Sequence, residues 1–319
     1  MTKLLRALLA GACLSAFAFM PIATQASAPQ AKVQAPGWYR TMVGDIEVTV
    51  LSDGTMQLPV TQLLKGDATR IGDSLRRNFQ GEQVETSVNA YLVNTGGKLV
   101  LVDTGSGVFF GPGGGNLAKN LRAAGYRPEQ VDEIYITHMH GDHIGGLVQG
   151  SKRAFPNATL RIDRRDTDFW LSETIMASAP EEARQFFKAA MAAVTPYRKA
   201  GKLKTFEGAT QLVPGVSAVP AYGHTPGHTL YTVESKGQKL VLWGDLMHVA
   251  AVQFEDPSVT IAFDTDNAAA AQARQAAYAD AAKNGFLVGA AHLPFPGMGR
   301  LRAADKGYVF VPLNYSALR

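Results

Sequence analysis

Three of the seven histidines in this chain of 319 residues lie within six consecutive positions. The segment THMHGDHIGG places His138, His140 and His143 around Asp142. On an extended loop, side chains two positions apart point the same way, so His138 and His140 can reach one ion. Asp142 and His143 then turn towards a second ion nearby. Imidazole and carboxylate suit Zn²⁺ and similar divalent metals. The spacing favours a metal site over a polar surface loop that happens to hold histidines.

The other four histidines also follow predicted strands. His224 and His228 belong to the segment GHTPGH, His248 follows Asp245 by three residues, and His292 ends the last predicted strand. The chain therefore places its imidazoles in loops after strands and almost nowhere else. In α/β folds, functional sites gather at such strand ends.

Strand and helix patterns alternate along the chain and would position these loops. The ranges with strand patterns are 46–54, where a turn ends the strand, 131–137 and 285–292, with hairpins at 90–105 and 230–245. The helical patterns cover 116–126, 165–200 and 268–283. This alternation indicates an α/β protein. Gly141, Gly145 and Gly146 allow the backbone to wrap closely around the histidine loop.

The two predicted hairpins resemble each other. GGKLVLVDTG and GQKLVLWGD each run from a glycine turn through Lys-Leu-Val-Leu to a carboxylate, Asp103 or Asp245. The similarity favours two related halves that face each other as two sheets with helices outside. A chance likeness between two Val/Leu-rich strands is the alternative. No domain linker is recognisable within residues 38–319, which predicts one domain.

The first 28 residues have the pattern of a signal peptide. Lys3 and Arg6 precede an apolar run, and small residues follow it. The run is short for a transmembrane helix, so we expect no stable membrane insertion; a buried N-terminal helix is the alternative. We expect export to a bacterial periplasm and a flexible segment at 29–37. The only cysteine, Cys13, lies in the signal sequence, so the mature protein would contain no disulfide.

The overall composition excludes some classes of partner. Hydrophobic residues make up 46% of the chain and charged residues 18%, as in soluble globular proteins. The net charge of +4 comes without a basic cluster or a nucleic-acid-binding motif. We therefore expect no nucleic-acid partner.

Four separated motifs resemble those of the metallo-β-lactamase superfamily. They are H-x-H-x-D-H, G-H-T-x-G-H, a G-D after a strand, and a last strand ending in histidine, and the resemblance covers nearly all of residues 38–319. VDEIYITHMH, AAVQFEDPSV, HLPFPG and FVPLNYS are similar to segments of methyl parathion hydrolases, a group that includes lactonases and aryl-ester hydrolases of the dihydrocoumarin hydrolase kind. The resemblance implies an α/β (α+β) fold, an αββα sandwich of two facing sheets flanked by helices.

The same resemblance implies a centre of two divalent ions. Zinc is the first choice, and manganese, cobalt and cadmium are alternatives. The implied ligands are His138, His140 and His224 for one ion, Asp142, His143 and His292 for the other, and Asp245 as a bridge. His228 and Asp103 would orient ligands from outside the set, although Asp103 could instead be a strand-end turn residue.

An apolar substrate pocket is the third implication. Its expected residues are Phe110, Trp170, Phe186, His248, Ile261 and Phe263. Each aromatic residue could instead belong to the core, and His248 could be structural; we do not expect it to be a ligand. The organophosphate hydrolases among these relatives carry an aliphatic residue where this chain has His248. The resemblance therefore favours lactones over phosphotriesters as substrates of this chain.

These implications predict a hydrolase in which a hydroxide between two metals cleaves lactones or aryl esters, with Asp142 and Asp245 as catalytic residues. Organophosphate triesters would be side substrates. One alternative is a methyl parathion hydrolase proper, with phosphotriesters as main substrates. Another is a non-catalytic periplasmic metal-binding protein. We also expect that the chain can form a homodimer.

Overall fold

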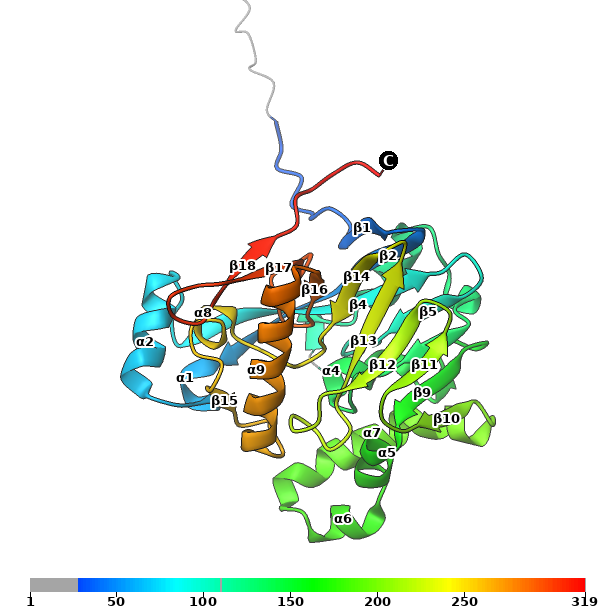
Figure 1. Cartoon of the computed structure of the whole chain (residues 1–319). Helices are drawn as coiled ribbons and strands as arrows, with labels where there is room; N and C mark the ends of the chain where they lie inside the picture. Colours follow the sequence, from blue (N-terminus) through cyan, green and yellow to red (C-terminus); the bar gives the residue numbers. More distant parts are fainter. Residues whose placement is uncertain (1–27, 110, 319) are drawn as a thin grey trace, which may run out of the picture. The chain divides into compact units, whose positions relative to one another are not determined.

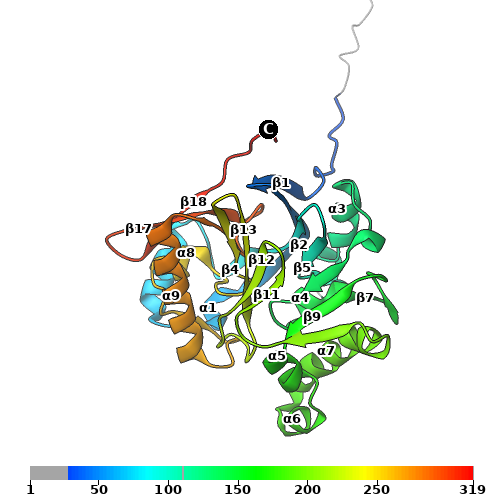
Figure 2. The same cartoon turned by 45° about the vertical axis from the view of Figure 1, so that its right-hand side comes forward.

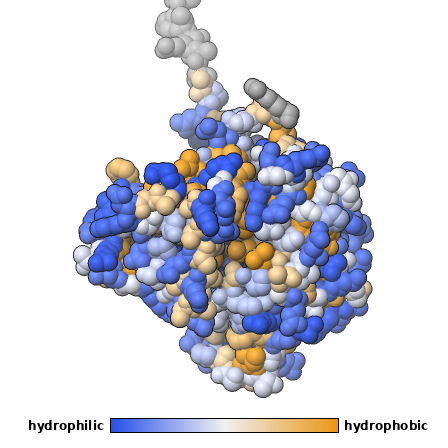
Figure 3. Space-filling view, viewed as in Figure 1, coloured by the Kyte–Doolittle hydropathy of each residue, from blue (hydrophilic) through white to orange (hydrophobic). Residues whose placement is uncertain are grey.

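The computed structural model describes residues 28–109 and 111–318. The predicted signal peptide, except Ala28, and the pocket candidate Phe110 lie outside the described residues. Residues 36–319 form one compact unit, and the fold below is that of this unit. None of the described helices is long and apolar enough to cross a membrane. The face in Figure 3 carries mainly hydrophilic side chains, with apolar ones in scattered groups.

Two seven-stranded sheets form the centre of the unit (Figure 1). The first sheet runs in the order β1 (Trp38–Val43), β2 (Ile46–Pro59), β4 (Gln83–Asn94), β5 (Leu99–Val102), β6 (Glu133–Tyr135), β9 (Thr159–Asp163) and β10 (Leu203–Phe206). The second runs β11 (Thr210–Val213), β12 (Val216–Pro220), β13 (Thr229–Ser235), β14 (Gln238–Leu242), β16 (Leu287–Gly289), β17 (Met298–Ala303) and β18 (Tyr308–Pro312). Two short ribbons pair β3 (Leu64–Lys65) with β15 (Thr260–Ile261), and β7 (Val148–Gln149) with β8 (Lys152–Arg153).

Helices lie on the outer faces of both sheets (Figure 2). The helices of the unit are α1 (Val60–Leu63), α2 (Ala68–Arg77), α3 (Leu117–Ala123), α4 (Gly141–Ile144), α5 (Arg164–Trp170), α6 (Glu173–Ser178), α7 (Glu181–Lys199), α8 (Ala250–Gln253) and α9 (Asn267–Asn284). Three short 3₁₀ helices lie at Gly111–Gly113, Pro128–Gln130 and Gly145–Leu147. α3 and α7 pack on the first sheet and α9 packs on the second. The predicted αββα sandwich is thus confirmed.

Alternation along the strands creates the separate core layers. In β5, Leu99 and Leu101 face α3 and α7, whereas Val100 and Val102 face the second sheet. Successive side chains of a strand point to opposite faces, so a strand buried on both sides reads as an unbroken apolar run. The Leu-Val-Leu-Val sequence of β5 satisfies this requirement.

The predicted hairpins take matching places in the two sheets. β4 and β5 are antiparallel, and β5 then pairs in parallel with β6. β13 and β14 are likewise antiparallel, and β14 pairs in parallel with β16. The similarity of the two sequences therefore corresponds to similar positions.

Three predicted ranges differ in detail from the structure. The strand predicted at 285–292 as the last one is β16, which ends at Gly289, and β17 and β18 follow it. The helical range predicted at 165–200 is divided into α5, α6 and α7, because Asp163 and Ser172 cap new helices and Pro180 precedes the third. The strand predicted at 46–54 is β2, which does not end at Gly54 but continues to Pro59. The register shifts between Ser52 and Gly54, so SDG forms a β-bulge instead of a turn.

Candidate metal centre

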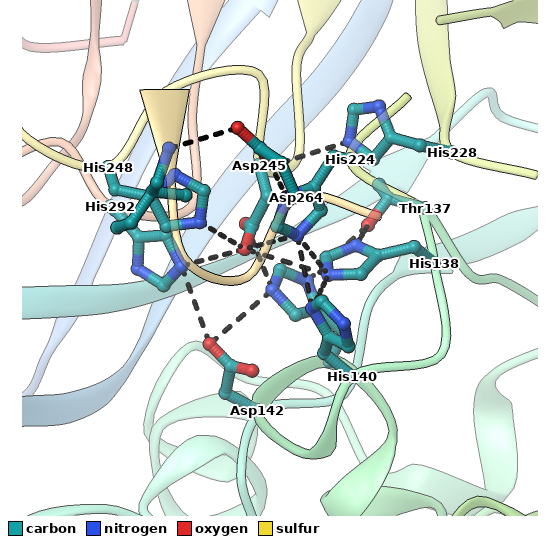
Figure 4. A network of polar contacts seen from close by, with 12 residues as sticks. Thr137, His138, His140, Asp142, His224, His228, Asp245, His248, Asp264 and His292 are labelled. Atoms are coloured by element: carbon teal, nitrogen blue, oxygen red, sulfur yellow. Dashed lines mark hydrogen bonds and ion pairs between the residues drawn. The ribbon is translucent and has the colours of Figure 1, made fainter. Parts of the chain in front are cut away.

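Seven of the predicted site residues converge at one place between the two sheets (Figure 4). Their ligand atoms form two groups, each with all atoms within 4.8 Å of one another. The groups are His138, His140, His224 and Asp245, and Asp142, His143, Asp245 and His292. Asp245 belongs to both groups.

The ends of strands from both sheets supply these residues. His138 and His140 follow β6 of the first sheet, and α4 begins directly after them with Asp142 and His143 in it. The second sheet contributes the other three through the loop between β12 and β13 and the segments after β14 and β16. The strand-end location predicted from the sequence is what brings distant histidines together.

Three ring nitrogens of the first group form a small triangle. His138 Nε2 lies 3.0 Å from His140 Nδ1, and His224 Nε2 lies 3.2 Å and 3.0 Å from these two atoms. Ligands about 2.0–2.1 Å from a tetrahedral zinc are separated by about 3.3 Å. The triangle therefore has the size of one face of such a site.

Hydrogen bonds to residues outside the first group occupy the Nδ1 atoms of His224 and His138. The Nε2 lone pairs of both rings then point into the group. His224 Nδ1 lies 2.8 Å from Asp264 Oδ1, so this nitrogen carries the proton and Nε2 is left with a lone pair. His138 Nδ1 lies 3.1 Å from Thr137 Oγ1, which donates its own proton to Asp103. Thr137 therefore accepts from His138, whose Nε2 also offers a lone pair.

The second group is arranged in the same way. His143 Nδ1 donates to Asp103 Oδ2 at 2.8 Å, and His292 Nδ1 donates to the carbonyl of Ser87 at 2.9 Å. The Nε2 atom of His292 then faces Asp245 Oδ2 at 3.1 Å and Asp142 Oδ2 at 3.4 Å.

Two buried polar atoms of the second group lack hydrogen-bond partners, and they show whether a cation would fit there. His143 Nε2 and Asp245 Oδ1 are 3.0 Å apart, and neither has a hydrogen-bond partner among the described residues. Unpaired buried polar atoms are costly, so native proteins seldom leave them. A divalent cation between these atoms would satisfy both, and imidazole with carboxylate is a suitable donor set.

The electrostatics agree with this fit. Burial lowers the pKa of His140 to about 3, so its ring is neutral and can act as a ligand. Burial also opposes a charge on His143, but Asp245, Asp142 and Asp103 outweigh it and raise the pKa well above the usual range. The carboxylates thus draw positive charge to this place, which a divalent ion would supply.

His228 lies beside the centre but points its ring elsewhere. Its Nδ1 donates to the carbonyl of Ala221 at 3.1 Å, and its Nε2 accepts the backbone N–H of Asp245 at 3.1 Å. Both ring nitrogens are therefore engaged. His228 fixes the backbone of Asp245 and offers no lone pair to an ion.

Asp103 makes the contact that an orienting residue requires, because its carboxylate accepts from the ring of the predicted ligand His143. Besides His143, its carboxylate accepts the N–H and the hydroxyl of Thr137, both at 2.8 Å. Its backbone φ of +60° is uncommon for a residue other than glycine. A strand-end turn does not require these three hydrogen bonds. Together with the unfavourable backbone conformation, they favour the orienting role over that of a turn residue.

His248 lies closer to the centre than the sequence indicated. Its Nε2 is 3.1 Å from Asp245 Oδ2, and its ring stacks on His292 with centroids 5.1 Å apart. Gln253 holds its backbone, because Oε1 accepts the N–H of His248 at 2.8 Å. Neither ring nitrogen has a hydrogen bond among the described residues.

Three of the described pocket candidates, Trp170, His248 and Phe263, lie beside or near the predicted ligands. The Trp170 ring meets the edge of His140 at 5.4 Å, and the Phe263 ring lies 6.0 Å from His248 and is 40% exposed. Phe186 is 54% exposed, and its neighbour Phe187 is the residue that packs on Trp170. Ile261 is fully buried in a cluster with α1, α2 and α8, so it belongs to the core there.

Sequence reasoning missed three residues that support the centre: Asp264, Gln253 and Asp166. Asp264 and Gln253 hold His224 and His248, and Asp166 accepts the backbone N–H of Met139. Asp264 and Asp166 lie 40 and 27 residues along the chain from their partners, and Gln253 belongs to none of the motifs, so no sequence signal marked them.

Comparison with known proteins relates this geometry to a family. Residues 84–292 match the family model described as the metallo-beta-lactamase superfamily. The hydrolase AbOPH of the beta lactamase superfamily is 35% identical, with a TM-score of 0.85 over 89% of this chain and 100% of that one. The dizinc quorum-quenching lactonase AidC, solved with the product N-hexnoyl-L-homoserine, is 29% identical, with a TM-score of 0.81 over 88% of this chain and 99% of that one.

Curated relatives include N-acyl homoserine lactonases. The one from Bacillus sp is 27% identical, over 58% of this chain and 74% of its own length. The one from Bacillus cereus is 28% identical over 46% of this chain, and the match spans half of that relative's length.

Proposed function

Because this chain belongs to the metallo-beta-lactamase superfamily, we propose that it is a dinuclear zinc hydrolase that opens lactones and cleaves aryl esters. Metal-dependent hydrolysis follows from the family and from the donor set. The observation that carries the dinuclear part is the sharing of Asp245 by two complete ligand groups. A structural zinc site encloses a single ion, whereas here Asp245 joins two four-residue groups. This sharing therefore disfavours a non-catalytic metal-binding protein.

The roles of the residues follow from their contacts. His138, His140 and His224 would hold one ion, Asp142, His143 and His292 the other, and Asp245 both. When bound, two such ions supply a lowered pKa for water and a Lewis acid for the ester carbonyl.

The residues around the ligands hold them in position. Asp264 fixes the ring of His224, Asp103 fixes that of His143, and His228 fixes the backbone from which Asp245 projects. Outer partners of this kind orient ligands and raise their basicity.

The choice of lactones rests on the relatives and on His248. AidC and the Bacillus relatives are lactonases at 27–29% identity, which supports cyclic esters, including N-acyl homoserine lactones, as the substrate class. His248 lies against Asp245 and narrows the space beside it. A lactone needs little room there because its leaving oxygen stays tethered to the acyl part, whereas a phosphotriester needs room in three directions. Export through the N-terminal signal sequence is part of the proposal and rests on sequence alone.

A substrate panel with metal analysis tests the proposal. The zinc-loaded protein would be assayed with dihydrocoumarin, phenyl acetate, an N-acyl homoserine lactone, a cephalosporin and methyl parathion. We expect about two ions per chain after dialysis and the highest kcat/KM on a lactone. Asp245→Ala should abolish hydrolysis. One ion or none per chain would contradict the dinuclear centre, and a preference for methyl parathion or the cephalosporin would contradict the substrate class.

A further inference from the structure

We propose that Asp166 is a positioning residue that clamps together the two loops carrying the three imidazoles of the first ligand group. The inference rests on the metal centre of the proposed function and adds a residue outside both ligand groups. Asp166 lies in the first turn of α5 and is fully buried.

The clamp consists of two hydrogen bonds to one carboxylate. Asp166 Oδ2 accepts the N–H of Met139 at 2.8 Å, and Oδ1 accepts the N–H of Gly227 at 2.7 Å. Met139 stands between His138 and His140, and Gly227 lies in the loop that carries His224. The first loop follows β6 of one sheet and the second precedes β13 of the other. One side chain therefore sets the separation of ligands that come from different sheets.

The close fit of Gly227 shows how tightly the second loop is held. A Cβ atom at this position would lie 2.5 Å from the backbone nitrogen of Asp166. The loop can approach α5 this closely only with glycine, which accounts for the second glycine of GHTPGH. The hydrogen bond holds the loop against α5, and the lack of a side chain at Gly227 allows this close approach.

The choice of a charged side chain also indicates positioning. Burial raises the pKa of Asp166 to about 6, because taking a carboxylate out of water is unfavourable. An asparagine would avoid this cost, but it has one acceptor oxygen and an amide group that would face the second N–H. A carboxylate offers an acceptor to both loops at once.

A matched pair of isosteric variants separates positioning from general stability. Asp53 is also buried, at 1% exposure, and it also binds backbone donors, namely the N–H groups of Ser106, Gly115 and Leu117. None of these donors adjoins a predicted ligand. Asp53→Asn therefore imposes the same chemical change away from the first ligand group.

The experiment compares zinc retention in wild type, Asp166→Asn and Asp53→Asn. Each zinc-loaded protein would be titrated with a chelator, and the ions left on the chain would be counted by elemental analysis. We expect Asp166→Asn to lose one ion at about 10- to 100-fold lower chelator concentration than wild type, the usual effect of losing an outer partner. Asp53→Asn should retain both ions like wild type. Equal retention in the two variants would overturn the proposal.

Amide exchange of the wild-type protein tests the clamp even if a variant does not fold. The N–H groups of Met139 and Gly227 should remain protected after the chelator has removed zinc, because Asp166 holds them without a metal. Fast exchange of both groups under these conditions would also overturn the proposal. Neither readout depends on hydrolysis, so an inactive protein with protected amides would count against the proposed function alone.

Discussion

The two histidines of GHTPGH should respond in opposite ways to replacement by alanine. His224 offers a bare Nε2 to the centre because its Nδ1 is bound to Asp264. His228 uses both nitrogens within the protein, one on the Ala221 carbonyl and one on the Asp245 N–H. We therefore expect His224→Ala to retain one ion fewer than wild type, and His228→Ala to retain both.

The cost of His228→Ala follows from the two hydrogen bonds that it breaks. The Ala221 carbonyl and the Asp245 N–H each lose a partner in a buried place. A buried polar group without a partner costs about 1–3 kcal/mol, so the free energy of unfolding should fall by about 2–6 kcal/mol. Loss of an outer partner lowers activity by about 10- to 100-fold, which corresponds to about 1.4–2.7 kcal/mol in the activation barrier.

Three measurements on the two variants test this reasoning. Elemental analysis after dialysis counts the ions, urea denaturation of the zinc-loaded proteins gives the stability, and kcat/KM on dihydrocoumarin gives the activity. His228→Ala should be a slower, less stable enzyme with two ions. If His228→Ala loses an ion while His224→Ala keeps both, the assignment of lone pairs from the hydrogen bonds is refuted.

Two further predictions concern the backbone of the histidine loop and the pocket. In Gly146→Ala the new Cβ would lie 1.9 Å from the Thr104 carbonyl oxygen, whereas in Gly141→Ala the nearest side chain is 3.6 Å away. Overpacking costs about 1–3 kcal/mol, and a clash with a backbone atom belongs at the upper end of that range. Thermal unfolding should therefore give a Tm lower by about 6 °C for Gly146→Ala and little change for Gly141→Ala, and equal Tm values would contradict the steric argument. His248→Leu removes the ring against Asp245 and should raise kcat/KM for methyl parathion about tenfold relative to dihydrocoumarin, or about 1.4 kcal/mol; an unchanged ratio would assign His248 a structural role.

Strands with a regular apolar pattern and the turns that end them could be predicted from the sequence. Apolar runs such as Leu-Val-Leu-Val, glycine turns and strand-end histidines follow from local geometry, and the structure places the hairpins at 90–105 and 230–245 as expected. The bulge at Asp53 could not be predicted, because SDG suits a turn as well as a bulge. Only the partner strand β4, which continues beside β2, decides between them.

The position of His248 could not be predicted from the sequence for a different reason. The sequence gives its spacing of three from Asp245 but not whether residues 245–248 are extended or turned. An extended segment would carry His248 away from the centre, and a turned one returns it to the same side. The N–H groups of His248 and Val249 both donate to Gln253 Oε1, which holds the segment in its turned form. That contact depends on tertiary packing and leaves no mark in the local sequence.

The hydrogen bonds around the ligands also explain an asymmetry within the first group. His138 and His224 present Nε2 to the centre because outer partners occupy their Nδ1 atoms. His140 presents Nδ1 instead, and no hydrogen bond of its Nε2 is found among the described residues. Its ring is positioned by the edge contact with Trp170, which itself packs on Phe187. Packing thus holds the ring of His140, as a carboxylate holds that of His224. A residue predicted to line the substrate pocket therefore also contacts a predicted ligand.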